Sequence, residues 1–192
     1  MKIACIAWGS LLWKAGFLPL VSQWHPDGPL LPLEFARVSD VNNELALVLC
    51  EGAPLMPTRW AYLDVADIRT ARELLRQREK ITPERPAWIG SVPSLGLTPP
   101  QARITRWLQE KALDACVWTA LPPKSAGQNG RKLTADEAVA YLDGLSGEVR
   151  AHAKDYIQRI PADITTPYRE LIEVRLGWWP HETLERDYRM RA

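Results

Sequence analysis

The chain has 192 residues, and its 24 basic and 23 acidic side chains give a formal net charge of +1. A chain of this length buries a core large enough to fold without disulfides or a structural metal. The balanced charge provides no electrostatic footprint for a nucleic acid or an anionic membrane, so we expect neither as a partner.

Three cysteines, Cys5, Cys50 and Cys116, each lie within an apolar run. Their odd number and irregular spacing predict reduced, buried thiols, as in a cytosolic protein. The apolar start of the chain is interrupted at Gly9 and Ser10, which does not match a secretory signal. No apolar run approaches the roughly 20 residues that cross a bilayer. We therefore expect a cytoplasmic protein.

The first part of the chain is predicted to form short β-strands. Apolar and β-branched runs are separated there by Gly, Pro and Asn residues that indicate turns. The expected strands span residues 2–8, 33–39, 44–50 and 59–65, with later strands at residues 87–92 and 115–121. Because helices follow and separate these strands, the sequence predicts a mixed α/β fold.

Two helices are expected between the later strands. Asp67 is a suitable N-cap for a helix over residues 67–80, and Pro83 prevents that helix from continuing. Thr98 is a suitable N-cap for a second helix over residues 98–113.

A third helix is expected over residues 134–159. Thr134 and Glu137 have the spacing of a capping box at its start. Gly144 and Gly147 are weak points within it, because glycine lowers helix stability.

Most kinds of catalytic site are excluded by the residues present. The three histidines, His25, His152 and His181, are far apart and have no His or Cys at the spacing of metal ligands. No glycine-rich stretch matches a phosphate-binding loop, and Ser10 lacks the second glycine of a nucleophile elbow. The cysteines lie in apolar runs rather than in an electropositive setting. We therefore expect no metal site and no Ser or Cys nucleophile, which leaves the carboxylates.

Glu79 is the carboxylate with an unusual placement. On a helical wheel at ~100° per residue, Glu79 lies about 20° from Ile68, on the same side as Leu75. Glu73 and Gln77 point away from this apolar side, as solvent-exposed residues do. Glu79 is thus predicted to face the core in the last turn of its helix.

Two interpretations of Glu79 are open at this point. Burial and the negative end of the helix dipole both favour the protonated form of a carboxyl group, which suits a general base or acid near neutral pH. Alternatively, Glu79 ends the buried stripe without a catalytic role, and either reaches outward or pairs with Arg72 or Arg78.

Four segments occur in an order that matches a known family. WGSLLWKAGF, from Trp8 to Phe17, is similar to a Tyr-Gly-Ser-Leu-(Ile/Leu)-Trp-x-x-Gly-Phe opening. RWAYLDV and a helix ending in RQREK resemble a strand and a helix with an Arg-Glu-Lys-like triplet. ACVWTALPP resembles a later strand, and YLDGL with KDYI a closing helical region. Over residues 3–160 the chain therefore resembles the ChaC-type γ-glutamylcyclotransferases.

This resemblance implies a mixed α/β fold with a small barrel-like sheet surrounded by helices. It also implies a cofactor-free reaction, in which the α-amine of a small γ-glutamyl substrate attacks its own γ-carbonyl and releases 5-oxoproline and an amine, amino acid or peptide. By the same resemblance, Glu79 is the general base, and backbone N–H groups of the loop after the first strand bind the substrate. That loop consists of Trp8, Gly9, Ser10, Leu11 and Leu12.

The chain departs from the family pattern at three places. Trp8 stands where the family has Tyr, so a bulkier wall replaces a hydroxyl. The segment ITPERPAWIG replaces a Gly-Gly-Tyr-like segment, and Trp88 is a candidate for part of its role. Glu34 stands where an Arg commonly precedes the Phe of the second strand, and Arg37 follows two residues after Phe35. These departures affect the expected substrate more than the expected reaction.

The same matches predict how the chain is organised. A γ-glutamylcyclotransferase-like domain is expected over residues 1–160, with residues 161–192 as a C-terminal extension packed on it. The chain from residue 166 onward is expected to be helical in part, with a break at residues 177–180.

The alternative function is a non-catalytic protein that binds a ligand or a partner on the same fold. Trp8 and the proline-rich segment would then have altered its pocket. Glu79 favours the enzyme, because a binding module has little reason to place a carboxylate at the end of a core stripe.

Overall fold

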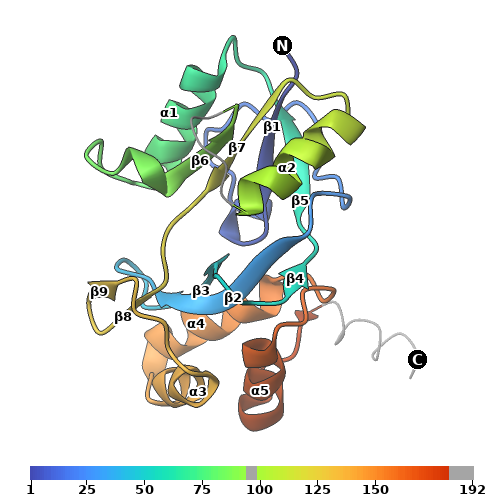
Figure 1. The fold of residues 1–192 in the computed structure, drawn as a ribbon. Helices are drawn as coiled ribbons and strands as arrows, with labels where there is room; N and C mark the ends of the chain where they lie inside the picture. Colours follow the sequence, from blue (N-terminus) through green and yellow to red (C-terminus); the bar gives the residue numbers. More distant parts are fainter. Residues whose placement is uncertain (94–98, 182–192) are drawn as a thin grey trace. The chain divides into compact units, whose positions relative to one another are not determined.

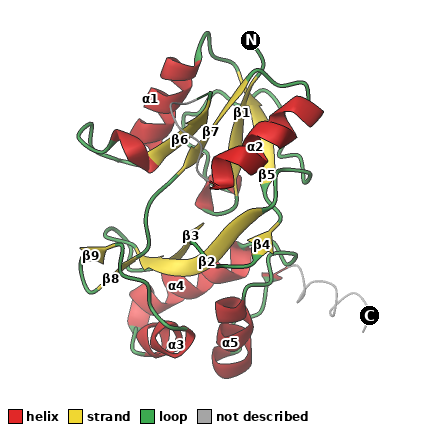
Figure 2. Ribbon diagram, viewed as in Figure 1, coloured by secondary structure: helices red, strands yellow, loops and turns green. Residues whose placement is uncertain are grey.

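Two open β-sheets organise residues 1–93 and 99–181, which are the residues that this computed structural model describes (Figures 1 and 2). The predicted mixed α/β class is confirmed, and helices pack on both sheets. Within the described residues the strands form two separate sheets and not one closed barrel.

The chain forms two compact units. The first unit consists of residues 1–31 and 57–121, and the second of residues 32–56 and the described residues from 122 onward. The division expected at residue 160 stays a prediction, because the end of the expected extension lies outside the described residues.

The sheet of the first unit has the strand order β5-β1-β7-β6. β1 and β7 run parallel, whereas β5 and β6 are antiparallel to their neighbours. All four strands were expected from the sequence. Their bounds are β1 (Ile3–Ala7), β5 (Arg59–Leu63), β6 (Ile89–Val92) and β7 (Ala115–Thr119).

One helix covers each face of this sheet (Figure 1). Side chains alternate between the faces, and Cys5 and Val117 pack with Leu75 of α1 (Ile68–Arg78) in one apolar cluster. On the opposite face, Trp107 of α2 (Pro99–Glu110) packs against Trp60, with ring centroids 5.5 Å apart.

Helix α1 confirms both its predicted start and its predicted buried face. The Asp67 carboxylate accepts a hydrogen bond of 2.8 Å from the backbone N–H of Thr70, as an N-cap does. Ala71 and Leu75 are fully buried. For α2 the expected cap, Thr98, lies outside the described residues.

The sheet of the second unit has the strand order β3-β2-β8-β9, and β4 pairs with β2. Its strands are β2 (Leu31–Val38), β3 (Leu45–Leu49), β4 (Leu55–Met56), β8 (Lys124–Ser125) and β9 (Gln128–Asn129). Its helices are α3 (Ala135–Asp143), α4 (Gly147–Arg159) and α5 (Pro167–Leu176). Helix α4 packs on β3, where the Tyr156 hydroxyl accepts a hydrogen bond of 3.2 Å from the Leu47 N–H.

The prediction of a single helix over residues 134–159 is wrong. Its capping box is confirmed, because Thr134 and Glu137 exchange hydrogen bonds. The helix nevertheless divides into α3 and α4, and Gly147 has a left-handed φ of +55°, which glycine adopts more readily than other residues. The two glycines of this stretch thus mark the break itself.

Two other outcomes concern short elements. The predicted break at residues 177–180 is confirmed, since Gly177 ends α5 with a left-handed φ of +69°. The strands β4, β8 and β9 were not predicted, because two residues show no periodicity.

We predict that Gly90→Ala destabilises the protein. Gly90 lies opposite Trp118, and a Cβ at Gly90 would meet the buried indole at 2.0 Å. Overpacking of this kind costs roughly 1–3 kcal/mol, which urea denaturation of the variant can measure. As a control, Gly144→Ala should be nearly neutral, because Gly144 has a φ of −71° and its Cβ would approach nothing closer than 3.4 Å. Equal stability of the two variants would contradict the tight contact.

Candidate functional site

Glu79 and the loop that follows β1 lie at the same edge of the first unit's sheet. Leu63, at the end of β5, pairs with Ile3, at the start of β1, so α1 begins near the amino-terminal edge of β1. Helix α1 has 11 residues and β1 has 5, and both lengths correspond to about 16 Å. The end of α1 therefore reaches the edge at which β1 ends.

The loop after β1 offers its backbone rather than its side chains. Residues 10–12 form a single 3₁₀ turn, in which the Leu12 N–H donates to the Gly9 carbonyl at 2.9 Å. Within residues 1–93 and 99–181, no acceptor is found for the amide N–H groups of Ser10 and Leu11. Unpaired amides at the start of a helical turn are suited to bind an anionic or carbonyl oxygen.

The apolar side chains of this loop belong to the core. Leu11 is 5% exposed and packs in the same cluster as Cys5 and Leu75, and Leu12 packs against that cluster. Trp8 is also 5% exposed. These three residues stay predicted substrate-binding residues, but the described geometry gives their side chains a packing role.

Glu79 is the C-cap of α1, and its backbone N–H donates to the Leu75 carbonyl at 2.9 Å. Its side chain is 14% exposed, in agreement with the predicted orientation. Of the two arginines considered as partners, Arg78 holds it, with 2.7 Å between Arg78 Nη1 and Glu79 Oε1. Arg72 instead donates to the Ser91 hydroxyl at 2.7 Å and to the Pro86 carbonyl at 2.8 Å.

Arg78 also joins the helix end to the loop. Its Nη2 donates to the Ser10 hydroxyl at 3.3 Å, and its Nε donates to the Lys14 carbonyl at 3.1 Å. One guanidinium thus brings together two of the residues singled out from the sequence, Glu79 and Ser10. Sequence reasoning named Arg78 only as a partner of Glu79, because a helical wheel gives the direction of a side chain and not its reach.

Cys5 lies beneath this pair in the core. Burial raises the pKa of the Cys5 thiol to about 12, the Glu79 carboxylate adds to the rise, and the Arg78 guanidinium opposes it. Both charges therefore affect the pKa of Cys5. Its thiol stays neutral in the core, as its apolar surroundings predicted.

Two further residues occupy the same sheet edge. Thr119 ends β7, and the buried Thr119 hydroxyl has no hydrogen-bond partner in the described part of the chain. Trp88 precedes β6, packs against the core cluster, and accepts a hydrogen bond of 2.7 Å from the Ala120 N–H. The Arg85 guanidinium lies over its ring, 4.3 Å from the centroid. The role suggested for Trp88 stays a prediction.

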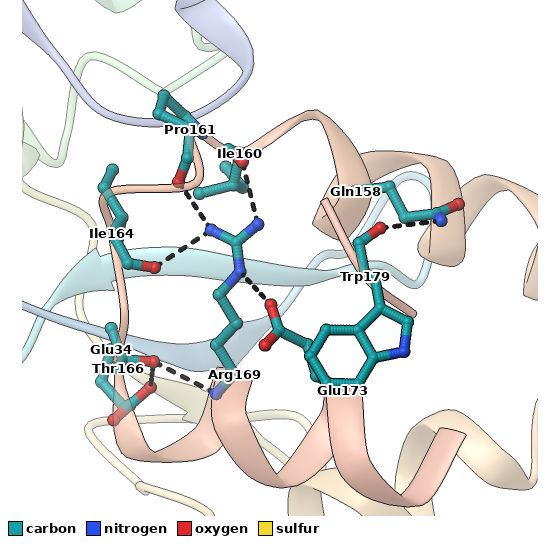
Figure 3. Close-up of polar contacts among 9 residues, drawn as sticks. All are labelled: Glu34, Gln158, Ile160, Pro161, Ile164, Thr166, Arg169, Glu173 and Trp179. Atoms are coloured by element: carbon teal, nitrogen blue, oxygen red, sulfur yellow. Dashed lines mark hydrogen bonds and ion pairs between the residues drawn. The ribbon is translucent and has the colours of Figure 1, made fainter. Parts of the chain in front are cut away.

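A second buried polar cluster lies in the second unit, around Arg169 (Figure 3). The Arg169 guanidinium is 1% exposed, and it donates to the Glu173 carboxylate at 2.9 Å. It also donates to three backbone carbonyls around the end of α4, those of Ile160, Pro161 and Ile164. Because Arg169 of α5 thus satisfies carbonyl groups at the end of α4, we assign this cluster a structural role.

Glu34 belongs to the same structural cluster. Its Oε1 accepts hydrogen bonds from the Thr166 hydroxyl at 2.5 Å and from the Phe35 N–H at 2.9 Å. Burial raises the pKa of Glu34, and hydrogen bonds from Thr166, Phe35 and the Tyr168 backbone limit the rise. Its place at the N-terminus of α5 links β2 to that helix.

Two classes of site are absent from the described residues. In residues 1–93 and 99–181, no group of three or more His, Cys, Asp or Glu side chains is placed to hold a metal ion. No helix in these two ranges is both long and apolar enough to span a bilayer.

Comparison with known proteins finds similarity among solved structures alone. No protein-family model and no curated protein matches the chain. Among solved structures, the chain is similar to a yeast γ-glutamyl cyclotransferase specific to glutathione. The match covers 92% of this chain and 98% of that chain, with 14% sequence identity and a TM-score of 0.45. A likeness at this level does not carry an activity from one chain to the other.

We predict that Cys5 resists alkylation in the folded protein. With its pKa raised to about 12, the thiolate fraction at pH 8 is roughly 1,000-fold below that of a free cysteine, and burial adds to the protection. Mass spectrometry after iodoacetamide treatment at pH 8 should find Cys5 unmodified, and fully modified when urea is present. Modification at the rate of a free thiol in the folded protein would contradict this placement.

We predict that Glu34→Gln changes how stability depends on pH. Because the pKa of Glu34 is raised in the folded state, its stabilising contribution is present at low pH and is lost as pH rises through the raised pKa. Glutamine stays neutral, so the variant should gain stability relative to wild type as pH rises, by at most about 1.4 kcal/mol per pH unit. Urea denaturation from pH 4 to pH 7 measures this difference, and parallel curves would exclude it.

Proposed function

We propose that this chain is a γ-glutamylcyclotransferase-like enzyme. It would cyclise the γ-glutamyl group of a small substrate to 5-oxoproline and release an amine, an amino acid or a peptide. The observation that supports this most is the link made by Arg78 between a largely buried carboxylate, Glu79, and the loop at Ser10. The residue proposed as the base and the loop proposed to bind the substrate are thus linked by one side chain.

The reaction needs only the groups found there. Glu79 takes a proton from the α-ammonium group of the substrate, and the free amine forms a bond to the γ-carbonyl carbon. The attacking nitrogen then gives up a second proton, and the bond between that carbon and the leaving nitrogen breaks. The leaving nitrogen receives both protons by way of Glu79 and departs as an ammonium group. Because the attack is intramolecular, the protein has to fold the glutamyl group and to relay protons from the attacking nitrogen to the leaving nitrogen.

The loop supplies the holding groups. The amides of Ser10 and Leu11 would donate to an oxygen of the glutamyl group, and Gly9 lets the substrate approach the backbone. The Leu11 side chain is fixed in the core cluster, which keeps these amides oriented. Such preorganisation lowers the entropic cost of binding the substrate in a reactive conformation.

We predict that Glu79→Gln abolishes most of the activity. Loss of a general base lowers kcat by about 10²- to 10⁴-fold, which can be measured as 5-oxoproline released from γ-glutamyl amino acids, γ-glutamyl amines and glutathione. Glu73→Gln is the matched control, because Glu73 lies on the same helix but is exposed and bonded to Arg76. Its kcat should equal that of wild type.

Two results would count against the proposal in different ways. Equal 5-oxoproline release by wild type and Glu79→Gln would remove Glu79 from the mechanism. No release by wild type from any member of the panel would contradict the enzyme and favour the alternative, a non-catalytic binding protein. Binding of the same compounds without turnover, measured by calorimetry, would then identify what it binds.

A further inference from the structure

Arg78 is more extensively engaged than a surface arginine at a helix end. Its side chain is 10% exposed, and its three nitrogens reach three partners, namely Glu79, Ser10 and the Lys14 carbonyl. The loop closes over this side chain, since a Cβ at Gly16 would lie 3.7 Å from Arg78 Cγ. The guanidinium is therefore fixed from both the helix and the loop.

The ion pair between Arg78 and Glu79 involves only one of the two carboxylate oxygens. Arg78 occupies Oε1 of the carboxylate, whereas Oε2 has no hydrogen-bond partner among the described residues. In the second unit, by contrast, Arg169 is saturated by backbone carbonyls and the Glu173 carboxylate. Arg78 thus fixes the orientation of a carboxylate and leaves one of its oxygens available.

We propose that Arg78 is the positioning residue of this site. It holds Oε1 of Glu79 and the Ser10 loop in one arrangement, so that Oε2 faces the α-ammonium group of a substrate bound at the loop. This inference rests on the proposed function. It adds which oxygen acts as the base and which residue sets the distance between the base and the binding loop.

The geometry of the guanidinium explains why arginine serves here. A planar fork can donate to a carboxylate on one side and to a hydroxyl and a carbonyl on the other, whereas an ammonium group is a single point charge. Arg78→Lys would keep the charge and lose this simultaneous contact. A misplacement of about 1 Å between reacting groups can lower a rate by roughly 100-fold.

We predict that Arg78→Lys lowers kcat by about 100-fold, with folding retained in the far-ultraviolet circular dichroism spectrum. Ser10→Ala removes only the Ser10 contact and should lower kcat by a smaller factor. Arg76→Lys is the matched control, because Arg76 lies two residues before Arg78 on the same helix and pairs with Glu73. If Arg78→Lys keeps more than half of the wild-type kcat, the inference is wrong.

A double variant separates positioning from a general structural role. If Arg78 acts through Glu79, Arg78→Lys should have little further effect on the residual activity of Glu79→Gln. Equal losses in both backgrounds would overturn the inference. In ¹H–¹⁵N spectra, Arg78→Lys should also shift the amide signals of Ser10 and Leu11, and Arg76→Lys should not.

The failure of this inference differs from the failure of the proposed function. Absence of 5-oxoproline from wild type overturns the function, and the role of Arg78 in that reaction falls with it. An active wild type with an active Arg78→Lys variant overturns the inference alone, as does an amide spectrum that Arg78→Lys leaves unchanged.

Discussion

The parallel pairing of β1 with β7 is the constraint on which the candidate site depends. A parallel pair places the carboxyl ends of both strands at one edge, so the loop after Ala7 and the hydroxyl of Thr119 lie at that edge. Helix α1 packs on one face of this sheet and matches β1 in length, so the last residue of α1 lies at that edge too. A carboxylate at the end of α1 therefore meets the loop after β1 as a consequence of strand and helix lengths. Ligand sites at the carboxyl ends of parallel strands are common for this reason.

Arg169, which is buried, and Arg78, whose side chain is 10% exposed, show how similar interactions support different roles. A buried ion pair stabilises little unless its remaining hydrogen-bonding groups are satisfied. Around Arg169 they are satisfied by three backbone carbonyls at the end of α4, and the cluster ties that helix end to α5 (Figure 3). Around Arg78 the hydrogen bonds come from a loop, and Glu79 keeps an oxygen without a protein partner in the described residues. A carboxylate that is held in place but keeps one oxygen without a protein partner is a candidate catalytic group. A carboxylate in a fully hydrogen-bonded cluster is a structural one.

Local features of the fold could be predicted from the sequence, and long-range ones could not. The Asp67 cap, the buried Ala71 and Leu75 and the Thr134 capping box follow from hydrogen bonding and periodicity within a few residues. The distribution of strands between two sheets depends on pairing between distant segments, which no local pattern encodes. For the site, the wheel placed Glu79 on the buried side but could not choose between Arg72 and Arg78. Arg72 is drawn away by Ser91, a residue of β6 that is distant in sequence.

Trp8, where the sequence departs from the family pattern, is a buried side chain in the structure. As a substitution for tyrosine it suggested a bulkier wall beside the substrate. In the structure Trp8 is 5% exposed and Leu11 is equally buried, so both side chains hold the loop from within the core. The surface that the loop can offer is then the backbone between them, with Gly9 and Ser10 half-buried. In the proposed reaction, the binding backbone is fixed by buried side chains and the carboxylate is fixed by an arginine, so both are preorganised. That rigidity suits a reaction in which the substrate must fold onto itself.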